Sequence, residues 1–179
     1  MKFLEKDLEE IIFNSDHEHL IDRGLYIPKI LKRQLRIGNY GIADLVGFQR
    51  PYYHSGYDEI CKGEINVIEL KKDKISVSSF FQALNYVKGI QRYIEKYRPD
   101  MSDHYNYRIT IIGNDLDKKS SVVYLNDFFN TELCEQKIYD NVLTSVNLYT
   151  YSYEIDGLKF KYVEDYTLIN EGFWYVKTN

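Results

Sequence analysis

The chain has 179 residues and a formal net charge of -4, which fits one domain with a substantial core and does not favour nucleic-acid binding through bulk positive charge. Two cysteines, Cys61 and Cys134, are too few to cross-link a fold. The start MKFLEKDLEEII lacks the apolar run of a secretion signal, and no stretch approaches the ~20 apolar residues of a membrane span. We therefore expect a single domain over residues 1–179, located in the cytoplasm and without a membrane partner.

The first 50 residues predict two helical segments followed by two strands. Apolar residues at near-helical spacing in FLEKDLEEIIF indicate an opening helix that ends near Asn14. A second helical turn is expected from Glu18 to Asp22. The stretch KILKRQLRIGNYGIADLVGF then predicts a strand, a turn at Gly38-Asn39, and a second strand over about residues 40–50.

A loop, a strand and a long helix are expected next. Residues 51–63 contain Pro, Gly and polar residues, which favours an exposed loop. Residues 64–72 have the composition of a strand. The stretch SSFFQALNYVKGIQRYIEKY has helical periodicity, with Ser78 or Ser79 as its cap and Pro99 just past its end.

The second half of the chain predicts mainly strands. Residues 105–113 are apolar and β-branched, as in a buried strand, and residues 121–125 are a further strand candidate. A short helix is expected over 126–139. Two Tyr-rich runs about Asp156-Gly157 predict a β-hairpin, and residues 173–177 a last strand. The sequence therefore favours an α/β fold, with a mixed four- or five-stranded sheet flanked by helices and an added C-terminal hairpin.

Charged residues interrupt two of these strands. Asp44 lies within YGIADLVGF, and Glu69 and Lys71 lie within INVIELKKD. Because side chains alternate along a strand, Glu69 and Lys71 should share one face, where Asp44 can join them from a neighbouring strand. Two carboxylates and an amine on one solvent-facing patch can hold a divalent cation and activate water to cut a phosphodiester. The alternative is an exposed edge strand bearing Glu-x-Lys, with Asp44 in a turn at the end of a strand.

The order of these features resembles the PD-(D/E)xK nuclease superfamily, which has a helix with Glu, an Asp at a strand, Glu-x-Lys on the next strand and a helix with Gln. The segments EKDLEE, RGL, RQ, GIADLVG, VIELKK and QALNYV are most similar to NucS-like and RecB-like endonucleases, over about residues 5–93. No Pro precedes Asp44, and its long separation from Glu69 indicates an insertion at 51–63. The resemblance implies a restriction-endonuclease-like fold, with a core over about residues 3–125 and a C-terminal extension over 126–179.

The resemblance also implies residue roles around a bound Mg²⁺ or Mn²⁺. Asp44 and Glu69 would be metal ligands, with the backbone carbonyl of Leu70 as a third. Lys71 would orient or deprotonate the attacking water and stabilise charge in the transition state. Both roles for Lys71 are compatible with the sequence.

Further roles fall on the predicted helices and the first strand. Gln82 matches the glutamine of the superfamily's helix, which contacts phosphate or water. The catalytic acid of the first helix is either Glu5 or Glu9, one turn apart. Substrate contacts are expected from three further residues, Arg33, Gln34 and Tyr86.

The expected function is metal-dependent hydrolysis of DNA phosphodiester bonds, in phage biology, defence, repair or recombination. Nucleic acid, DNA in the first instance, is the expected partner, and a homodimer is compatible because such enzymes often dimerise. One alternative is a catalytically inactive module that uses the fold to bind nucleic acid or protein. Another is a nuclease that acts on RNA or cyclic nucleotides. The presence of Asp44, Glu69 and Lys71 together speaks against the inactive module.

Overall fold

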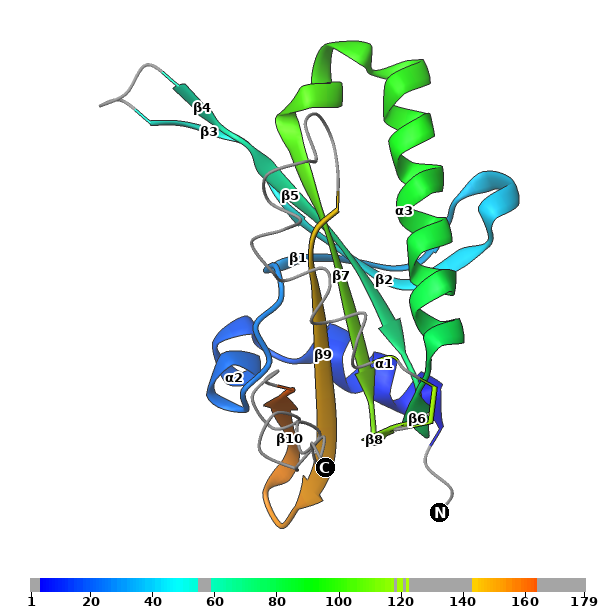
Figure 1. Cartoon of the computed structure of the whole chain (residues 1–179). Helices are drawn as coiled ribbons and strands as arrows, with labels where there is room; N and C mark the ends of the chain where they lie inside the picture. The colour runs from blue at the N-terminus through cyan, green and yellow to red at the C-terminus, as the bar shows by residue number, and fades with distance from the viewer. Residues whose placement is uncertain (1–3, 55–58, 118, 121, 123–142, 164–179) are drawn as a thin grey trace, which may run out of the picture.

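A six-stranded mixed sheet is the centre of the computed structural model, in which the described residues are 4–54, 59–117, 119–120, 122 and 143–163. The strand order is β1-β2-β5-β7-β9-β10 (Figure 1). The neighbours β5, β7 and β9 are parallel, and the other neighbouring pairs are antiparallel. The bounds are β1 (Ile30–Arg36), β2 (Ile42–Gln49), β5 (Gly63–Leu70), β7 (Tyr105–Gly113), β9 (Leu143–Glu154) and β10 (Gly157–Tyr162).

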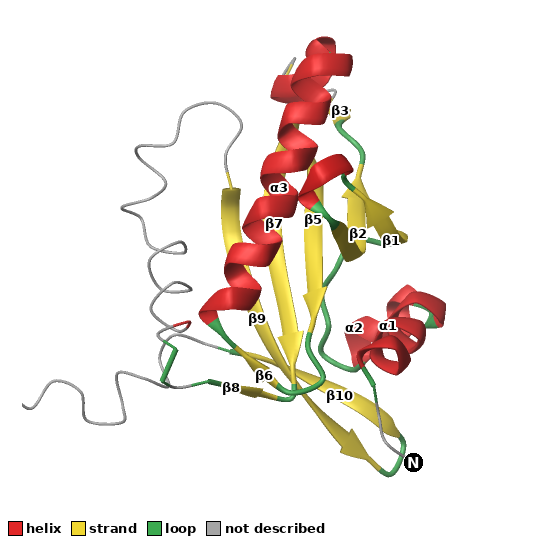
Figure 2. Cartoon of the chain, turned by 90° about the vertical axis from the view of Figure 1, so that its right-hand side faces the viewer, coloured by secondary structure: helices red, strands yellow, loops and turns green. Residues whose placement is uncertain are grey.

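Helices cover both faces of this sheet. The long helix α3 (Val77–Tyr97) packs against β5 and β7, away from the pair α1 (Glu5–Asn14) and α2 (His17–Asp22) (Figure 2). Successive residues of β5 point to opposite faces of the sheet and belong to different cores. Val67 belongs to the core beneath α3, and Ile68 to the core beneath α1 and α2. Strand β5 is mainly apolar on both faces because both are covered, and Asn66 and Glu69 are its buried polar residues.

The two N-terminal helices confirm the predicted pattern. Helix α1 ends at Asn14 as expected, and Leu8 and Ile12 of its apolar stripe are fully buried. Helix α2 begins at His17, one residue before the predicted start, because the side chain of Asp16 caps it by accepting the Glu18 backbone N–H at 3.1 Å.

The strands and the long helix that follow are also present, with shifted ends. The predicted turn between β1 and β2 is a short 3₁₀ helix, η1 (Gly38–Tyr40). The expected cap of α3 is wrong, since Ser76 has the extended backbone of an N-cap and Val77 starts the helix. Helix α3 ends at Tyr97, and Pro99 opens a second 3₁₀ segment, η2 (Pro99–His104).

The predicted loop at residues 51–63 is in part wrong. It contains an antiparallel strand pair, β3 (Tyr52–His54) and β4 (Glu59–Cys61), that projects from the ends of β2 and β5 (Figure 1). At the return point, a Cβ on Gly63 would lie 2.5 Å from the carbonyl oxygen of Gln49, so only glycine fits there. The insertion therefore leaves β2 and β5 adjacent despite the long separation of Asp44 and Glu69.

The C-terminal hairpin is confirmed, but it is not an addition to the sheet. Strands β9 and β10 are antiparallel, and Gly157 has the positive φ of 123° that suits a tight turn. Strand β9 also pairs with β7, so the hairpin supplies two of the six sheet strands. A small parallel pair, β6 (Lys74–Ile75) and β8 (Asp115–Leu116), was not predicted.

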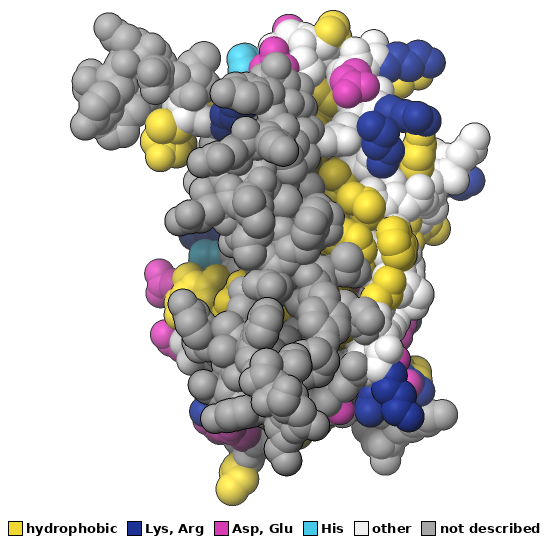
Figure 3. Space-filling model, in the orientation of Figure 1, with side chains coloured by type: hydrophobic (Ala, Val, Ile, Leu, Met, Phe, Trp, Pro, Cys, Tyr) yellow, Lys and Arg dark blue, Asp and Glu magenta, His cyan; other side chains and the backbone are white. Residues whose placement is uncertain are grey.

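Three predicted elements, over 121–125, 126–139 and 173–177, lie outside the described residues, Val122 excepted. Within the described part, none of the helices is long and apolar enough to cross a membrane. Figure 3 shows hydrophobic side chains on the side that carries α3, with Lys and Arg side chains at several separate places around them. In this view the basic residues do not form one continuous patch.

Candidate active site

Asp44 lies where strands β2 and β5 separate. The last paired residues are Leu45 and Ile68. Beyond this pair, Asp44 Oδ2 accepts a hydrogen bond from the backbone N–H of Leu70 at 2.9 Å. The side chain of Asp44 thus takes the place that a backbone carbonyl of β2 would have in a continued strand pair. The N–H and C=O of one residue in a strand point to the same edge. The carbonyl of Leu70 is therefore directed to the side on which Asp44 lies.

Glu69 is buried, and the expectation of a solvent-facing carboxylate is wrong for this residue. Its side chain is 1% exposed. Oε1 accepts a hydrogen bond from Lys71 Nζ at 2.6 Å, which confirms that Glu69 and Lys71 share one face. Oε2 is also buried, and no described residue donates a hydrogen bond to it. A buried carboxylate oxygen without a donor is costly, and such a group in a folded protein calls for an explanation.

Burial and neighbouring negative charges make both carboxylates harder to ionise. Burial raises the pKa of Glu69 to about 7, and the negative charge of Asp44 adds to the effect, against the opposing influence of Lys71. Burial also raises the pKa of Asp44, although the Leu70 N–H and Lys71 oppose it. Carboxylates with raised pKa values at the end of a strand are a frequent feature of functional sites.

Lys71 keeps its proton with these neighbours. Partial burial lowers its pKa, but the hydrogen bond to Glu69 and the charges of Glu69, Glu5 and Asp44 outweigh burial, so the net shift is upward. An ammonium group suits charge stabilisation and hydrogen-bond donation. It does not suit proton abstraction, which needs the neutral amine.

A prediction concerns the pH dependence of stability in EDTA. Between its ordinary pKa of 4.5 and about 7, Glu69 is protonated in the folded chain and ionised in the unfolded chain. The folded state then binds more protons, so this residue makes stability fall as pH rises through that window. Glu69→Gln should remove the loss and gain about 3 kcal/mol relative to the parent between pH 4.5 and 7.5. Urea unfolding of both proteins measures the difference, and a difference independent of pH would contradict the prediction.

The two acids of α1 have different partners. Glu9 is 4% exposed, and it accepts hydrogen bonds from Arg33 Nε at 2.6 Å and from the side-chain amide of Gln34. Gln34 has a φ of 49°, an unusual value for a residue other than glycine. Arg33 and Gln34 were expected to contact substrate, but in the structure both donate hydrogen bonds to the carboxylate of Glu9. Glu5 is exposed and accepts the backbone N–H of Lys72 at 3.3 Å.

Electrostatics also separate the two acids. The charge of Glu5 contributes to the raised pKa values of Asp44, Glu69 and Lys71. The charge of Glu9 contributes only to that of Asp44 among these three residues. Glu5 therefore contributes to the electrostatics of all three residues, whereas Glu9 is hydrogen-bonded to Arg33 and Gln34 of β1.

A second prediction follows for these acids. Glu9→Ala leaves a half-buried Arg33 without its carboxylate and should lower the free energy of unfolding by about 3 kcal/mol. Glu5→Ala removes an exposed side chain and should change stability by less than about 0.5 kcal/mol. Chemical denaturation at one pH compares the two variants directly. Equal losses would contradict the division of roles.

Helix α3 adds a polar chain beside the carboxylates. Lys71 Nζ lies 3.5 Å from Gln82 Oε1, and Gln82 Nε2 donates to the hydroxyl of Tyr86 at 2.9 Å. Tyr86 is 6% exposed, so its hydroxyl supports Gln82 from within the core. The structure thus brings Gln82 to Lys71, while Tyr86 is buried behind it.

One supporting residue was not predicted. The hydroxyl of Tyr151, on β9, donates to the backbone carbonyl of Lys72 at 2.8 Å and so holds the segment that follows Lys71. The two residues are 79 positions apart in sequence. The tyrosine richness of the hairpin is the only sequence signal at this position, and it does not point to the site.

Asp44 and Glu69 could hold a metal ion only together with other oxygen atoms. The described residues contain no group of three or more His, Cys, Asp or Glu side chains arranged to bind one. A magnesium ion is commonly bound by one or two carboxylates and water. The donor set fits, because Glu69 Oε2 is buried without a described partner and the Leu70 carbonyl is directed to the same edge as Asp44.

Comparisons with protein-family models, with curated proteins and with solved structures find no match for this chain.

Proposed function

We propose that this protein is a metal-dependent nuclease with a restriction-endonuclease-like fold of the PD-(D/E)xK type, and that it hydrolyses phosphodiester bonds in DNA. The observation that carries the proposal is the environment of Glu69. One carboxylate oxygen is bonded to Lys71, and the other is buried without a donor among the described residues, while the negative charge of Asp44 adds to the raised pKa of Glu69. A buried carboxylate oxygen without a donor destabilises the fold, so a glutamate with a purely structural role is not expected at this position.

Asp44, Glu69 and the carbonyl of Leu70 are the residues that would hold Mg²⁺ or Mn²⁺. When bound, such an ion supplies positive charge for the phosphate oxygens and acidifies water. The chain's contribution is to fix these oxygen atoms at the divergence of two strands. Rigid strands suit this purpose because they position ligands more accurately than loops.

Lys71 and Gln82 supply the remaining polar groups. The side chain of Lys71 is 22% exposed. Its ammonium group can therefore keep one hydrogen bond to Glu69 Oε1 and donate another to a phosphate oxygen. This donation gains strength as negative charge builds up in the transition state. The Gln82 amide, held by Tyr86, can orient water or a second phosphate oxygen. Lys71 is thus proposed as a charge stabiliser and Gln82 as a positioning residue.

A substrate panel tests the proposal. The full chain is incubated with single-stranded, double-stranded and branched DNA, with RNA and with cyclic nucleotides, each in Mg²⁺, in Mn²⁺ and in EDTA. We expect DNA cleavage that depends on metal and is lost in Glu69→Gln, a variant that keeps size and removes the charge. Cleavage of RNA or a cyclic nucleotide alone would redirect the substrate class. Binding without cleavage under every condition would identify the inactive module instead.

A further inference from the structure

A cavity of about 600 Å³ lies far from the carboxylates, at the opposite end of β5. Its lining residues follow β2, begin β3, and run from the end of α3 through η2 to the start of β7: Arg50, Pro51, Tyr52, Arg98, Met101, His104 and Tyr105. Strand β5 has eight residues between its two ends, Gly63 and Leu70. At ~3.3 Å per residue, the cavity and the candidate active site are separated by ~23 Å along the strand.

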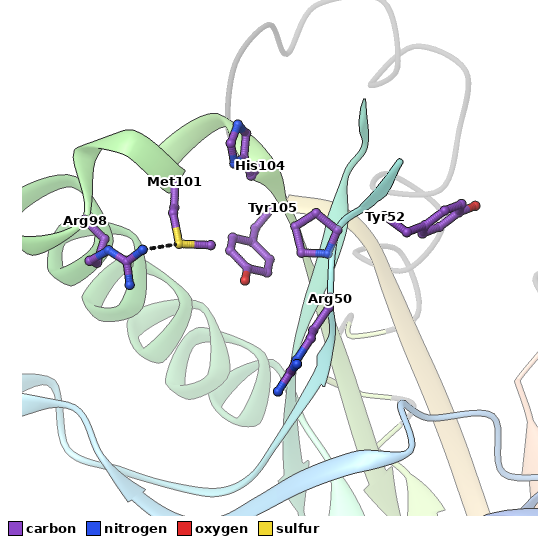
Figure 4. A pocket seen from close by; sticks show the side chains of 7 residues that line it. Arg50, Tyr52, Arg98, Met101, His104 and Tyr105 are labelled. Carbon is purple, nitrogen blue, oxygen red and sulfur yellow. Dashed lines mark hydrogen bonds between the residues drawn. The ribbon is translucent and has the colours of Figure 1, made fainter. Parts of the chain in front are cut away.

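The cavity combines positive charge with an aromatic face. Figure 4 shows the ring of Tyr105 next to Met101, with Arg98 on the far side of Met101 and the side chain of Arg50 below. Tyr52 points away from this ring (Figure 4). Two arginines and an aromatic ring thus line the same pocket, which gives it local positive charge in a chain of net charge -4.

The two arginines differ in what they already bind. Arg98 is held by Asp100 through two hydrogen bonds of 3.3 and 3.4 Å and contacts the sulfur of Met101 at 2.8 Å. Arg50 is exposed, and no described residue forms an ion pair or hydrogen bond with its guanidinium. Within the described part of the chain, Arg98 is therefore already paired with a carboxylate, whereas Arg50 is not.

The walls of the cavity are held in place by close backbone packing. A Cβ on Gly63 would lie 2.8 Å from Cδ and from the backbone nitrogen of Pro51, so the chain carrying Arg50 and Pro51 is pressed onto the start of β5. On the other side, Tyr105 packs against the core beneath α3. The cavity is open to solvent and combines a few polar groups with an apolar surface, which suits a ligand that keeps part of its surface exposed.

We propose that this cavity binds one nucleotide unit, with its phosphate on Arg50 and Arg98 and its base against Tyr105. Guanidinium groups bind phosphate through charge-assisted hydrogen bonds. An aromatic ring accepts any base by stacking. The site is separate from the metal-dependent chemistry and goes beyond the proposed function. The unit can be a free nucleotide or a nucleotide within a strand, and both present the same phosphate and base.

The sequence provides a specific reporter for this site, because the chain has only two methionines, Met1 and Met101. Labelling the methionine methyl groups with ¹³C gives two signals, and Met101→Leu assigns them. The titrations use the full chain in EDTA, with adenosine monophosphate, adenosine, inorganic phosphate and a short single-stranded DNA as separate probes. We expect the mononucleotide to shift the Met101 signal at lower concentration than adenosine or phosphate alone.

Variants separate the two halves of the ligand. Arg50→Ala should weaken mononucleotide binding about ten- to hundred-fold, and Tyr105→Leu should weaken it about fivefold or more while sparing inorganic phosphate. The matched control is Arg36→Ala, an exposed arginine at the end of β1 and outside the cavity, which should leave the titration unchanged. If the Arg50→Ala titration matches the parent, or Arg36→Ala weakens binding equally, the proposal is overturned.

The probes also identify the source of the nucleotide and keep this inference distinct from cleavage. Tighter binding of the DNA than of the mononucleotide indicates a strand, and the reverse indicates a free nucleotide. A Met101 signal that responds to no probe overturns the nucleotide site even if DNA is cleaved. A Met101 response in a protein that cleaves nothing supports the site while contradicting the proposed nuclease activity.

Discussion

Replacing Asp44 by alanine is expected to reduce metal-dependent DNA cleavage by at least about 10³-fold. The change removes one of the two carboxylates that would hold the cation, and charge stabilisation by such an ion is worth several kcal/mol in the transition state. It also removes the acceptor of the Leu70 backbone N–H, which is bonded to Asp44 Oδ2 at 2.9 Å. Single-turnover cleavage, measured over a range of Mg²⁺ concentrations, gives the size of the loss.

The matched control for this variant is Asp73→Ala. Asp73 lies in the segment between β5 and β6, has 80% of its side chain exposed and, among the described residues, forms an ion pair only with Lys72, at 3.6 Å. Cleavage by Asp73→Ala should stay within about twofold of the parent, because surface pairs of this kind contribute little. Calorimetric titration with Mn²⁺ should give weaker binding for Asp44→Ala alone. Full cleavage by Asp44→Ala at limiting Mg²⁺ would remove Asp44 from the site.

The second large effect is expected for Lys71→Ala, which should lower the rate of cleavage without lowering the affinity for the metal ion. Lys71→Ala retains Asp44, Glu69 and the Leu70 carbonyl, so Mn²⁺ affinity should be kept. Turnover should fall by about 10²–10⁴-fold, the range seen when a positioned charge or proton donor is lost. Single-turnover cleavage beside calorimetry measures both quantities on the same preparation.

Two neighbouring variants make the test of Lys71 specific. Lys72→Ala, which removes an ammonium paired with Asp73, should cleave like the parent. Gln82→Ala should lose less than Lys71→Ala, because Gln82 is 3.5 Å from Lys71 Nζ and positions groups without carrying charge. Parental turnover in Lys71→Ala, or loss of its metal affinity, would contradict the role proposed for this residue.

The sequence by itself determined the local elements and the residues of interest. Helical spacing in α1 and α3, the strands around Asp44 and Glu69, and the turn at Asp156-Gly157 follow from periodicity and turn chemistry, which act over a few residues. Alternation along a strand also placed Glu69 and Lys71 on one face, as their 2.6 Å contact confirms. These features need no knowledge of distant partners.

Only the tertiary structure decided how these elements combine. Strand β9 pairs with β7, and this pairing makes the hairpin part of the sheet. The two strands are distant in sequence, and no local sequence pattern predicts that they pair. The burial of Glu69 depends on the helix and strands packed around it, and so does the rise of its pKa to about 7. Glu9 was distinguished from Glu5 because Arg33 and Gln34 reach it from β1. Burial and partner choice are properties of packing between distant segments, and a one-dimensional pattern does not contain them.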